Sequence, residues 1–111
     1  ITGCGFIITE SLFSMDGDIA PLNIYYDLAK KYNLNLIVDE AHSVGLYGQY
    51  GAGLIDHFNL NANEIISING MGKAFGCYGA FVCGPKNILQ YMYLKYISIY
   101  SDSDKLPQRL F

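Results

Sequence analysis

Short apolar runs, separated by polar and glycine-rich segments, set the pattern of this chain. Four such runs lie at residues 6–9, 34–38, 64–68 and 80–83. Apolar runs of this length that are bounded by turn-forming residues are typical of buried strands. The pattern therefore predicts four strands, and the second and third of these lead into long loops.

Two longer helices are predicted between and after these strands. The first follows Pro21, a residue that suits the first turn of a helix, and it ends near Asn33. Its apolar positions recur at helical spacing, and they are Leu22, Tyr25, Leu28, Ala29 and Tyr32. The second runs from Pro85 to about residue 96, with one face formed by Ile88, Leu89, Met92 and Tyr96. A shorter helix is expected over residues 52–58.

The order of these elements favours an α/β fold, with a largely parallel sheet and flanking helices. Glycines concentrate in two loops, at residues 42–53 and 69–79, and each loop follows a predicted strand. In open α/β sheets, ligands bind beyond the carboxyl ends of the strands. The most permissive backbone of the chain therefore lies where a ligand is expected.

Composition narrows the class of protein. The chain has 111 residues, enough for one domain, and its 51% hydrophobic and 15% charged residues are typical of globular proteins. The net charge of −3 argues against nucleic-acid binding. No apolar run approaches the roughly 20 residues of a membrane helix.

Three cysteines without a CxxC pair indicate neither a disulfide framework nor a zinc site. We expect small buried thiols in a cytoplasmic protein. The chain begins on Ile1 rather than Met, and it ends on Phe111 without a polar tail. From these two ends we expect a fragment of a longer protein.

Three polar side chains follow the first two predicted strands. Asp39 ends the second strand, and His42 comes three residues later. A carboxylate at this edge is placed to meet a ligand, and it needs a cationic or proton-donating partner if it is buried. The alternative is that Asp39 only initiates a loop and that His42 lies on the surface. Ser14 follows the first strand, where it either caps the turn or contacts the same ligand.

Lys73 lies between Gly72 and Gly76 in the second glycine-rich loop. Glycines let the backbone approach a ligand closely, and a lysine shielded from water can act as a nucleophile toward a carbonyl carbon. An exposed, incidental lysine is the alternative. A phosphate-binding P-loop is excluded, because position 67 is Ser where that motif needs Gly, and position 74 is Ala where it needs Ser or Thr.

Three segments resemble the α-oxoamine synthases, which are fold-type I enzymes that use pyridoxal 5′-phosphate. They are residues 10–22 (ESLFSMDGDIAPL), residues 38–45 (VDEAHSVG) and residues 72–76 (GKAFG), the last followed by YGAFV at 78–82. Their order and spacing match the family, and the resemblance covers about residues 6 to 101. It implies that residues 1–111 are part of the large, cofactor-binding domain, without the family's N-terminal segment and small C-terminal domain.

The resemblance also implies roles for four residues. Asp39 pairs with the protonated pyridine nitrogen, His42 hydrogen-bonds the phenolic oxygen of the ring, and Ser14 lies near the same side of the cofactor. Lys73 bonds covalently to the cofactor and handles the α-proton of the bound amino acid. The implied reaction joins an amino acid to an acyl thioester of CoA or acyl-carrier protein. The implied assembly is a homodimer with its active site at the two-fold interface.

Two positions depart from the family pattern. The family has Thr or Ser three residues before the lysine, where it helps to hold the phosphate, and here that position is Gly70. Near the end of the chain, a family Thr reaches the phosphate of the neighbouring subunit. Here Asp102, within residues 101–103, stands at or near that position, and an acid repels a phosphate. A second class of function therefore stays open, namely a noncatalytic relative with a structural or dimerisation role.

Overall fold

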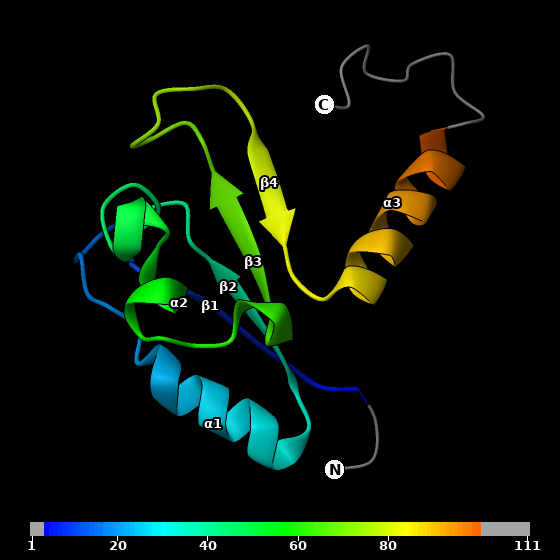
Figure 1. Cartoon of the computed structure of the whole chain (residues 1–111), viewed down its shortest axis with the longest axis horizontal. Coiled ribbons are helices and arrows are strands. Elements are labelled where there is room, and N and C mark those ends of the chain that lie inside the picture. The colour runs from blue at the N-terminus through cyan, green and yellow to red at the C-terminus, as the bar shows by residue number, and fades with distance from the viewer. Residues whose placement is uncertain (1–3, 101–111) are drawn as a thin grey trace.

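The computed structural model describes residues 4–100, which form an α/β layer structure (Figure 1). All four predicted strands are present: β1 (Phe6–Glu10), β2 (Asn35–Asp39), β3 (Ile65–Gly70) and β4 (Ala80–Cys83). The described residues also form three α-helices: α1 (Leu22–Tyr32), α2 (Leu54–His57) and α3 (Lys86–Tyr100). Two 3-10 turns that the sequence pattern did not predict flank α2, at Gln49–Gly51 and Ala62–Glu64.

The strands form one sheet in the order β1-β2-β3-β4. The first three are parallel, and Asp39 pairs with Glu10 on one side and with Ile68 on the other. β4 runs antiparallel to β3, so the expected largely parallel sheet is confirmed with one reversed edge strand. The connection between β3 and β4 spans only residues 71–79, whereas a parallel crossover needs a dozen residues or more.

This topology brings several strand ends to one edge of the sheet. The carboxyl ends of β1, β2 and β3 meet there, because parallel strands point the same way. The amino end of β4 joins them, since β3 and β4 form a hairpin. The loops that follow these strands are therefore neighbours, although they are far apart in the sequence.

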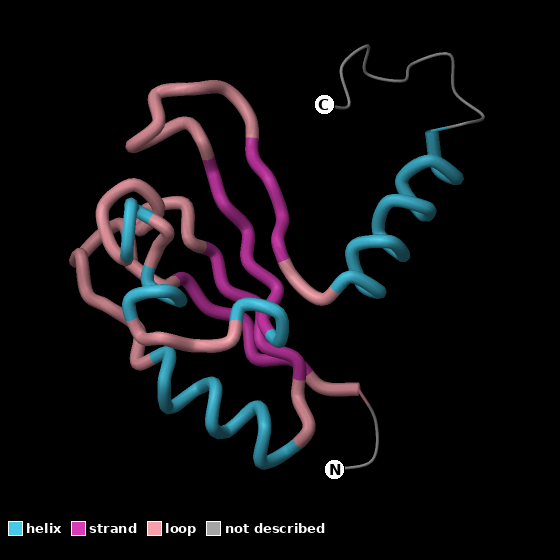
Figure 2. Tube along the Cα trace, viewed as in Figure 1, coloured by secondary structure: helices cyan, strands magenta, loops and turns pink. Residues whose placement is uncertain are grey.

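Helices α1 and α2 cover one face of the sheet (Figure 2). The side chains that form this core are at most 5% exposed. They are Ala20, Leu22, Ala29, Leu36, Val38, Leu54, Ile55 and Ile65. Because side chains alternate between the two faces along a strand, Leu36 and Val38 point to this face and Ile37 points away.

The opposite face of the sheet carries exposed apolar side chains. Phe6 and Ile8 in β1 are 54% and 73% exposed, and Ile68 in β3 is 39% exposed. The strand register places all three on the face that also carries Asp39. Helix α3 follows β4 and extends away from the sheet (Figure 1).

The ends of α1 agree with the sequence prediction. Tyr25 N donates to Pro21 O (3.1 Å) in its first turn. The C-cap Asn33 is in the left-handed conformation, with φ 52° and ψ 48°, which lets it close the helix. The helix that the spacing predicts is confirmed, and two of its apolar positions, Leu28 and Tyr32, are 39% and 47% exposed, because α1 packs on the sheet through a narrow stripe.

The expectation of buried thiols is also wrong, because Cys4, Cys77 and Cys83 are all free and exposed. Cys77 lies in the loop between β3 and β4, and Cys83 lies on the edge strand β4. Residues in a loop or on an edge strand are not covered by neighbouring elements on both sides. The positions of these cysteines in the fold, rather than their apolar character, therefore determine their exposure.

Candidate functional site

The four residues that the sequence singled out lie at or after the carboxyl ends of adjacent parallel strands. Ser14 lies after β1, Asp39 is the last residue of β2 with His42 just beyond it, and Lys73 lies after β3. Asp39 and His42 are half-buried, whereas Ser14 and Lys73 are exposed. The structure thus brings their chain segments to one edge of the sheet.

Asp39 is held in place at that edge by its own turn. Its Oδ1 accepts a hydrogen bond from Ala41 N (2.9 Å), and its backbone oxygen accepts one from Ser11 N (2.9 Å). A carboxylate has about four lone-pair sites, so these contacts leave acceptor capacity for a ligand. The side chain lies on the open face of the sheet, where a ligand can reach it.

Glu40, the next residue, points to the opposite face and is only 2% exposed. Its Oε1 accepts hydrogen bonds from Leu54 N (2.8 Å), Ile55 N (3.1 Å) and Ser43 Oγ (3.1 Å). Burial raises the pKa of the Glu40 carboxyl, and these hydrogen bonds oppose the rise. The carboxylate therefore ties the start of α2 to the loop that carries His42.

Sequence reasoning missed this role of Glu40, although a signal for it was present. Leu36 and Val38 are buried positions at a spacing of two along β2. Continuing that alternation by two residues puts Glu40 on the same, helix-covered face. A carboxylate at a core-facing position needs hydrogen-bond donors, and the backbone amides at the start of α2 supply them.

A second buried contact braces the same loop. Ser11 and Ser43 are both fully buried, and their hydroxyl oxygens lie 2.8 Å apart in a hydrogen bond. Ser11 Oγ also donates to the backbone oxygen of Asp39 (3.3 Å). The loops that follow β1 and β2 are thus joined below the edge where His42 lies.

The loop that carries Lys73 is closed by backbone hydrogen bonds at its base. Met71 N donates to Gly79 O (2.9 Å), and Cys77 N donates to Met71 O (2.8 Å). Gly76 N donates to Lys73 O (3.0 Å). The lysine therefore sits in a hairpin loop with both ends fixed to the sheet, while its side chain is exposed.

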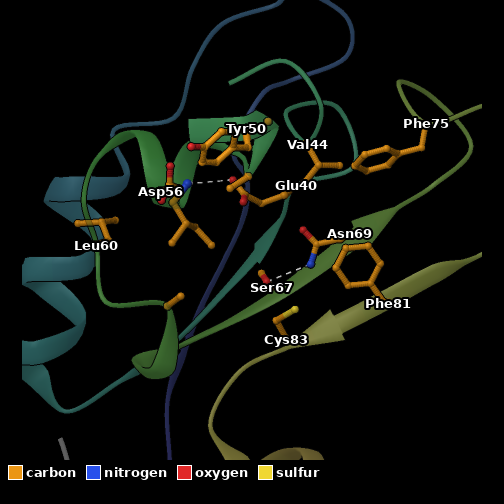
Figure 3. Close-up of a pocket in the computed structure, with 14 residues that line it drawn as sticks. Glu40, Val44, Tyr50, Asp56, Leu60, Ser67, Asn69, Phe75, Phe81 and Cys83 are labelled. Carbon is orange, nitrogen blue, oxygen red and sulfur yellow. Dashed lines mark hydrogen bonds between the residues drawn. The ribbon is translucent and has the colours of Figure 1, made fainter. Parts of the chain in front are cut away.

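A pocket of about 440 Å³ lies on the helix-covered face, between α2 and the strands β3 and β4 (Figure 3). Its lining includes Glu40, Tyr50, Ser67, Asn69, Phe81 and Cys83. Phe75, from the loop of Lys73, also reaches it (Figure 3). The four residues that the sequence singled out lie outside this lining, so the pocket and the strand-end site are separate features.

Ser14 lines a smaller hollow, of about 220 Å³, in the connection between β1 and α1. Glu10, Asp16 and Asp18 line it as well. Three carboxylates make this hollow electronegative, which disfavours an anionic group such as a phosphate. The hollow therefore suits a contact of Ser14 with a part of the cofactor other than its phosphate.

The residues at the strand ends fit the ring of pyridoxal 5′-phosphate better than its phosphate. Asp39 offers a carboxylate for a protonated ring nitrogen, and Lys73 offers an exposed amine. Gly70 offers no hydroxyl for the phosphate, and a Cβ atom at this position would lie 3.0 Å from Ala41 Cβ. The donors for a phosphate must therefore come from residues other than position 70.

Asp102 and residues 101–103 lie outside the residues that the structure describes. Between residues 4 and 100, no helix has the length and apolar character that crossing a membrane requires. Within the same range, no cluster of three or more His, Cys, Asp and Glu side chains is arranged to hold a metal ion.

Comparison with known proteins adds to this picture. The family model of aminotransferase class I and II matches residues 2–108. An 8-amino-7-oxononanoate synthase from Petrotoga mobilis is 49% identical over 86 residues, which make up 78% of this chain and 22% of that protein. A second, from Thermosipho melanesiensis, is 45% identical over the same shares. The chain spans 22% of the length of each of these relatives.

Solved structures give the same result. The 8-amino-7-oxononanoate synthase of Francisella tularensis superposes with a TM-score of 0.71 at 39% identity, over 93% of this chain and 30% of that one. A serine palmitoyltransferase from S. paucimobilis, described with a bound PLP–myriocin aldimine, superposes with a TM-score of 0.76 at 31% identity, over 84% of this chain and 23% of that one. Both similarities extend over most of this chain and a minor part of each relative.

Proposed function

Because the chain belongs to the aminotransferase class I and II family, we propose that it forms part of the large, cofactor-binding domain of an α-oxoamine synthase. The whole protein would be an acyltransferase that uses pyridoxal 5′-phosphate. The observation that carries the proposal is the placement of Asp39 at the carboxyl end of β2 and of Lys73 just after the carboxyl end of the adjacent strand β3. Ligands of open α/β sheets bind at that edge.

Each proposed site residue has a distinct task there. Bound pyridoxal 5′-phosphate supplies an electron sink for a carbanion at the α-carbon of an amino acid. A carboxylate at Asp39 would keep a proton on the ring nitrogen, and His42 would donate a hydrogen bond to the phenolic oxygen. The amine of Lys73 would hold the cofactor through a covalent bond, and the same amine, once released from that bond, would take the proton from the α-carbon. Ser14 contributes a contact on the same side.

Among family members, we propose 8-amino-7-oxononanoate synthase, which joins alanine to a pimeloyl thioester in biotin biosynthesis. The similarity to the Petrotoga and Thermosipho proteins supports this choice, as does the segment YGAFVCG at residues 78–84. Serine palmitoyltransferase is the second candidate, because a structure of that enzyme superposes on this chain. The segment GLYG at residues 45–48 favours a third candidate, 5-aminolevulinate synthase. The fourth candidate is 2-amino-3-ketobutyrate ligase.

The substrates proposed for the whole protein are an amino acid and an acyl thioester of CoA or acyl-carrier protein. We also propose a cytoplasmic homodimer with the active site at its two-fold interface. A panel of alanine, serine and glycine, each with pimeloyl, palmitoyl, succinyl and acetyl thioesters, separates the candidates. Fastest turnover of alanine with the pimeloyl thioester is the expected result, and fastest turnover of another pair would replace this choice of member.

The test of the cofactor role uses the protein expressed from its complete reading frame. Borohydride reduces the bond between a lysine amine and the carbonyl carbon of the cofactor to a stable amine, and mass spectrometry then locates the label. We expect the label on Lys73, and its loss in Lys73→Arg. Label on Lys86 or Lys95 would overturn the assignment. No label, together with no absorbance from bound cofactor, would favour a noncatalytic structural or dimerisation role.

A further inference from the structure

The loop after β2 and the loop of Lys73 come close at Gly45 and Ala74. Gly45 has φ +86°, and a Cβ atom built on it would lie 2.6 Å from Ala74 Cβ. That distance is far shorter than the van der Waals contact of two carbon atoms, about 3.5–4.0 Å. Any side chain at position 45 would therefore collide with Ala74, the residue next to Lys73.

We propose that Gly45 is a positioning residue, whose missing side chain sets how near the loop of Lys73 lies to the loop of His42. The inference rests on the proposed function only for the task of Lys73. The contact itself joins two segments that arise from different strands, β2 and β3. At this contact, the position of one loop limits how close the other can come.

The two sides of this contact differ in how firmly they are held. Ser43 and Val44, just before Gly45, are 0% and 3% exposed. Gly45 N itself donates to Gly51 O (2.7 Å), which closes its own loop. By contrast, residues 72–79 are all exposed. A side chain added at Gly45 would therefore displace the loop of Lys73 rather than the segment that Ser43 and Val44 anchor in the core.

Displacement of a reacting group is costly. A misplacement of about 1 Å can lower a rate about a hundredfold, because the reacting atoms no longer meet in the productive geometry. Gly45→Ala should accordingly impair the bond between Lys73 and the cofactor more than it impairs retention of the cofactor. A residue that only stabilised the fold would lower both together.

A set of three variants separates contact from backbone strain. Gly45→Ala adds both a contact and a side chain in the left-handed region. Gly76→Ala is the matched control, because Gly76 has φ +60° and nothing within 4 Å of its added Cβ atom. The double variant Gly45→Ala/Ala74→Gly keeps the strain at position 45 and removes the atom that the new Cβ would strike.

The readouts are the borohydride label on Lys73 at saturating pyridoxal 5′-phosphate, the kcat and KM of the synthase reaction, and the melting temperature of the cofactor-free protein. We expect Gly45→Ala to lower labelling and kcat at least about tenfold with a smaller change in KM. In the double variant, labelling of Lys73 and kcat should recover to the values of Gly76→Ala. If Gly45→Ala alone does not fold, recovery of folding and labelling in the double variant carries the same conclusion.

Three results would overturn the inference. Equal labelling in Gly45→Ala and Gly76→Ala would mean that strain alone matters. A double variant no better than Gly45→Ala would mean that Ala74 is not the partner. Normal labelling in Gly45→Ala would mean that Lys73 is not displaced. Failure of the wild type to label would instead count against the proposed function, while the melting temperatures of the three variants would still decide whether the contact exists.

Discussion

Asp39 and Glu40 are adjacent residues with the same functional group, yet the sheet gives them opposite surroundings. The Glu40 side chain is 2% exposed and accepts hydrogen bonds from two backbone amides at the start of α2. The Asp39 side chain is half-buried on the open face and accepts a hydrogen bond from one backbone amide of its own turn. Strand alternation alone separates a carboxylate that holds the fold from one that can meet a ligand.

The comparison extends to the two faces as wholes. The covered face is packed against α1 and α2, and its carboxylate, Glu40, is satisfied from within the chain. The open face carries exposed apolar side chains beside Asp39. Residues on the first face should therefore affect stability, and Asp39 on the second should affect chemistry. Four predictions follow this division, in order of decreasing effect.

Glu40→Ala should destabilise the protein by about 3 kcal/mol or more, because it leaves the buried amides of Leu54 and Ile55 without an acceptor. Chemical denaturation of the cofactor-free protein measures the loss. Glu64→Ala is the control, because this exposed carboxylate only pairs with Lys30 (3.2 Å) and accepts a hydrogen bond from Tyr26, and the loss of these exposed contacts should move the denaturation midpoint far less than Glu40→Ala does. A Glu40→Ala variant as stable as wild type would mean that the carboxylate does not brace the loop.

Asp39→Asn should leave the melting temperature nearly unchanged, since the amide oxygen still accepts from Ala41 N. Turnover by the complete protein should fall on the order of a hundredfold, because the charge that holds a proton on the ring nitrogen is lost. Glu10→Gln, at the position paired with Asp39 in β1, is the control for removing a nearby negative charge. Equal losses in the two variants would refute a specific role for Asp39.

The stability of the protein should depend on the charge of Glu40. Burial raises the pKa of this carboxyl above its ordinary value of 4.5, so the folded state binds the proton more tightly than the unfolded state. The stabilisation that comes from this tighter proton binding is fully present below the ordinary pKa of the carboxyl. It is lost as pH rises through the pKa of the folded state. The unfolding free energy of wild type minus that of Glu40→Gln should fall across this window, by at most about 1.4 kcal/mol per pH unit. A rising difference would contradict the shift.

Ile8→Thr should change stability by less than about 0.5 kcal/mol, because Ile8 is 73% exposed. Val38→Thr, on the covered face at 0% exposure, is its counterpart and should cost about 1–3 kcal/mol for burying a hydroxyl. Thermal denaturation of both variants tests whether the two faces differ as described. Equal losses would show that the open face is covered in the protein as it exists.

Local patterns predicted most of the fold. The apolar runs located all four strands, and Pro21 and Asn33 marked the ends of α1, because strand burial and helix caps depend on neighbours in the sequence. The reversed direction of β4 was not predicted, although the short connection at residues 71–79 required it. The exposure of Leu28 depended on how α1 packs, which its spacing does not encode.

The candidate site was predicted less completely than the fold. Asp39, His42 and Lys73 were recognised from their positions after strands, a feature that the sequence carries. Their roles toward the cofactor stay predictions. The bracing role of Glu40 was missed, since its partners lie 14 and 15 residues away in the chain. The contact of Gly45 with Ala74 depends on how two separate loops meet, and spacing carries no signal for it.

The hairpin of β3 and β4 has a consequence for the order in which the molecule assembles. Its strands are joined by residues 71–79 alone, whereas β1 and β2 are separated by α1 and its connections. Closing a short loop costs less chain entropy and is faster than closing a long one. The segment with the lysine is therefore expected to form early, and the strand with Asp39 to join β1 late. A partly folded chain would therefore contain the hairpin loop with Lys73 before β2 places Asp39 beside it.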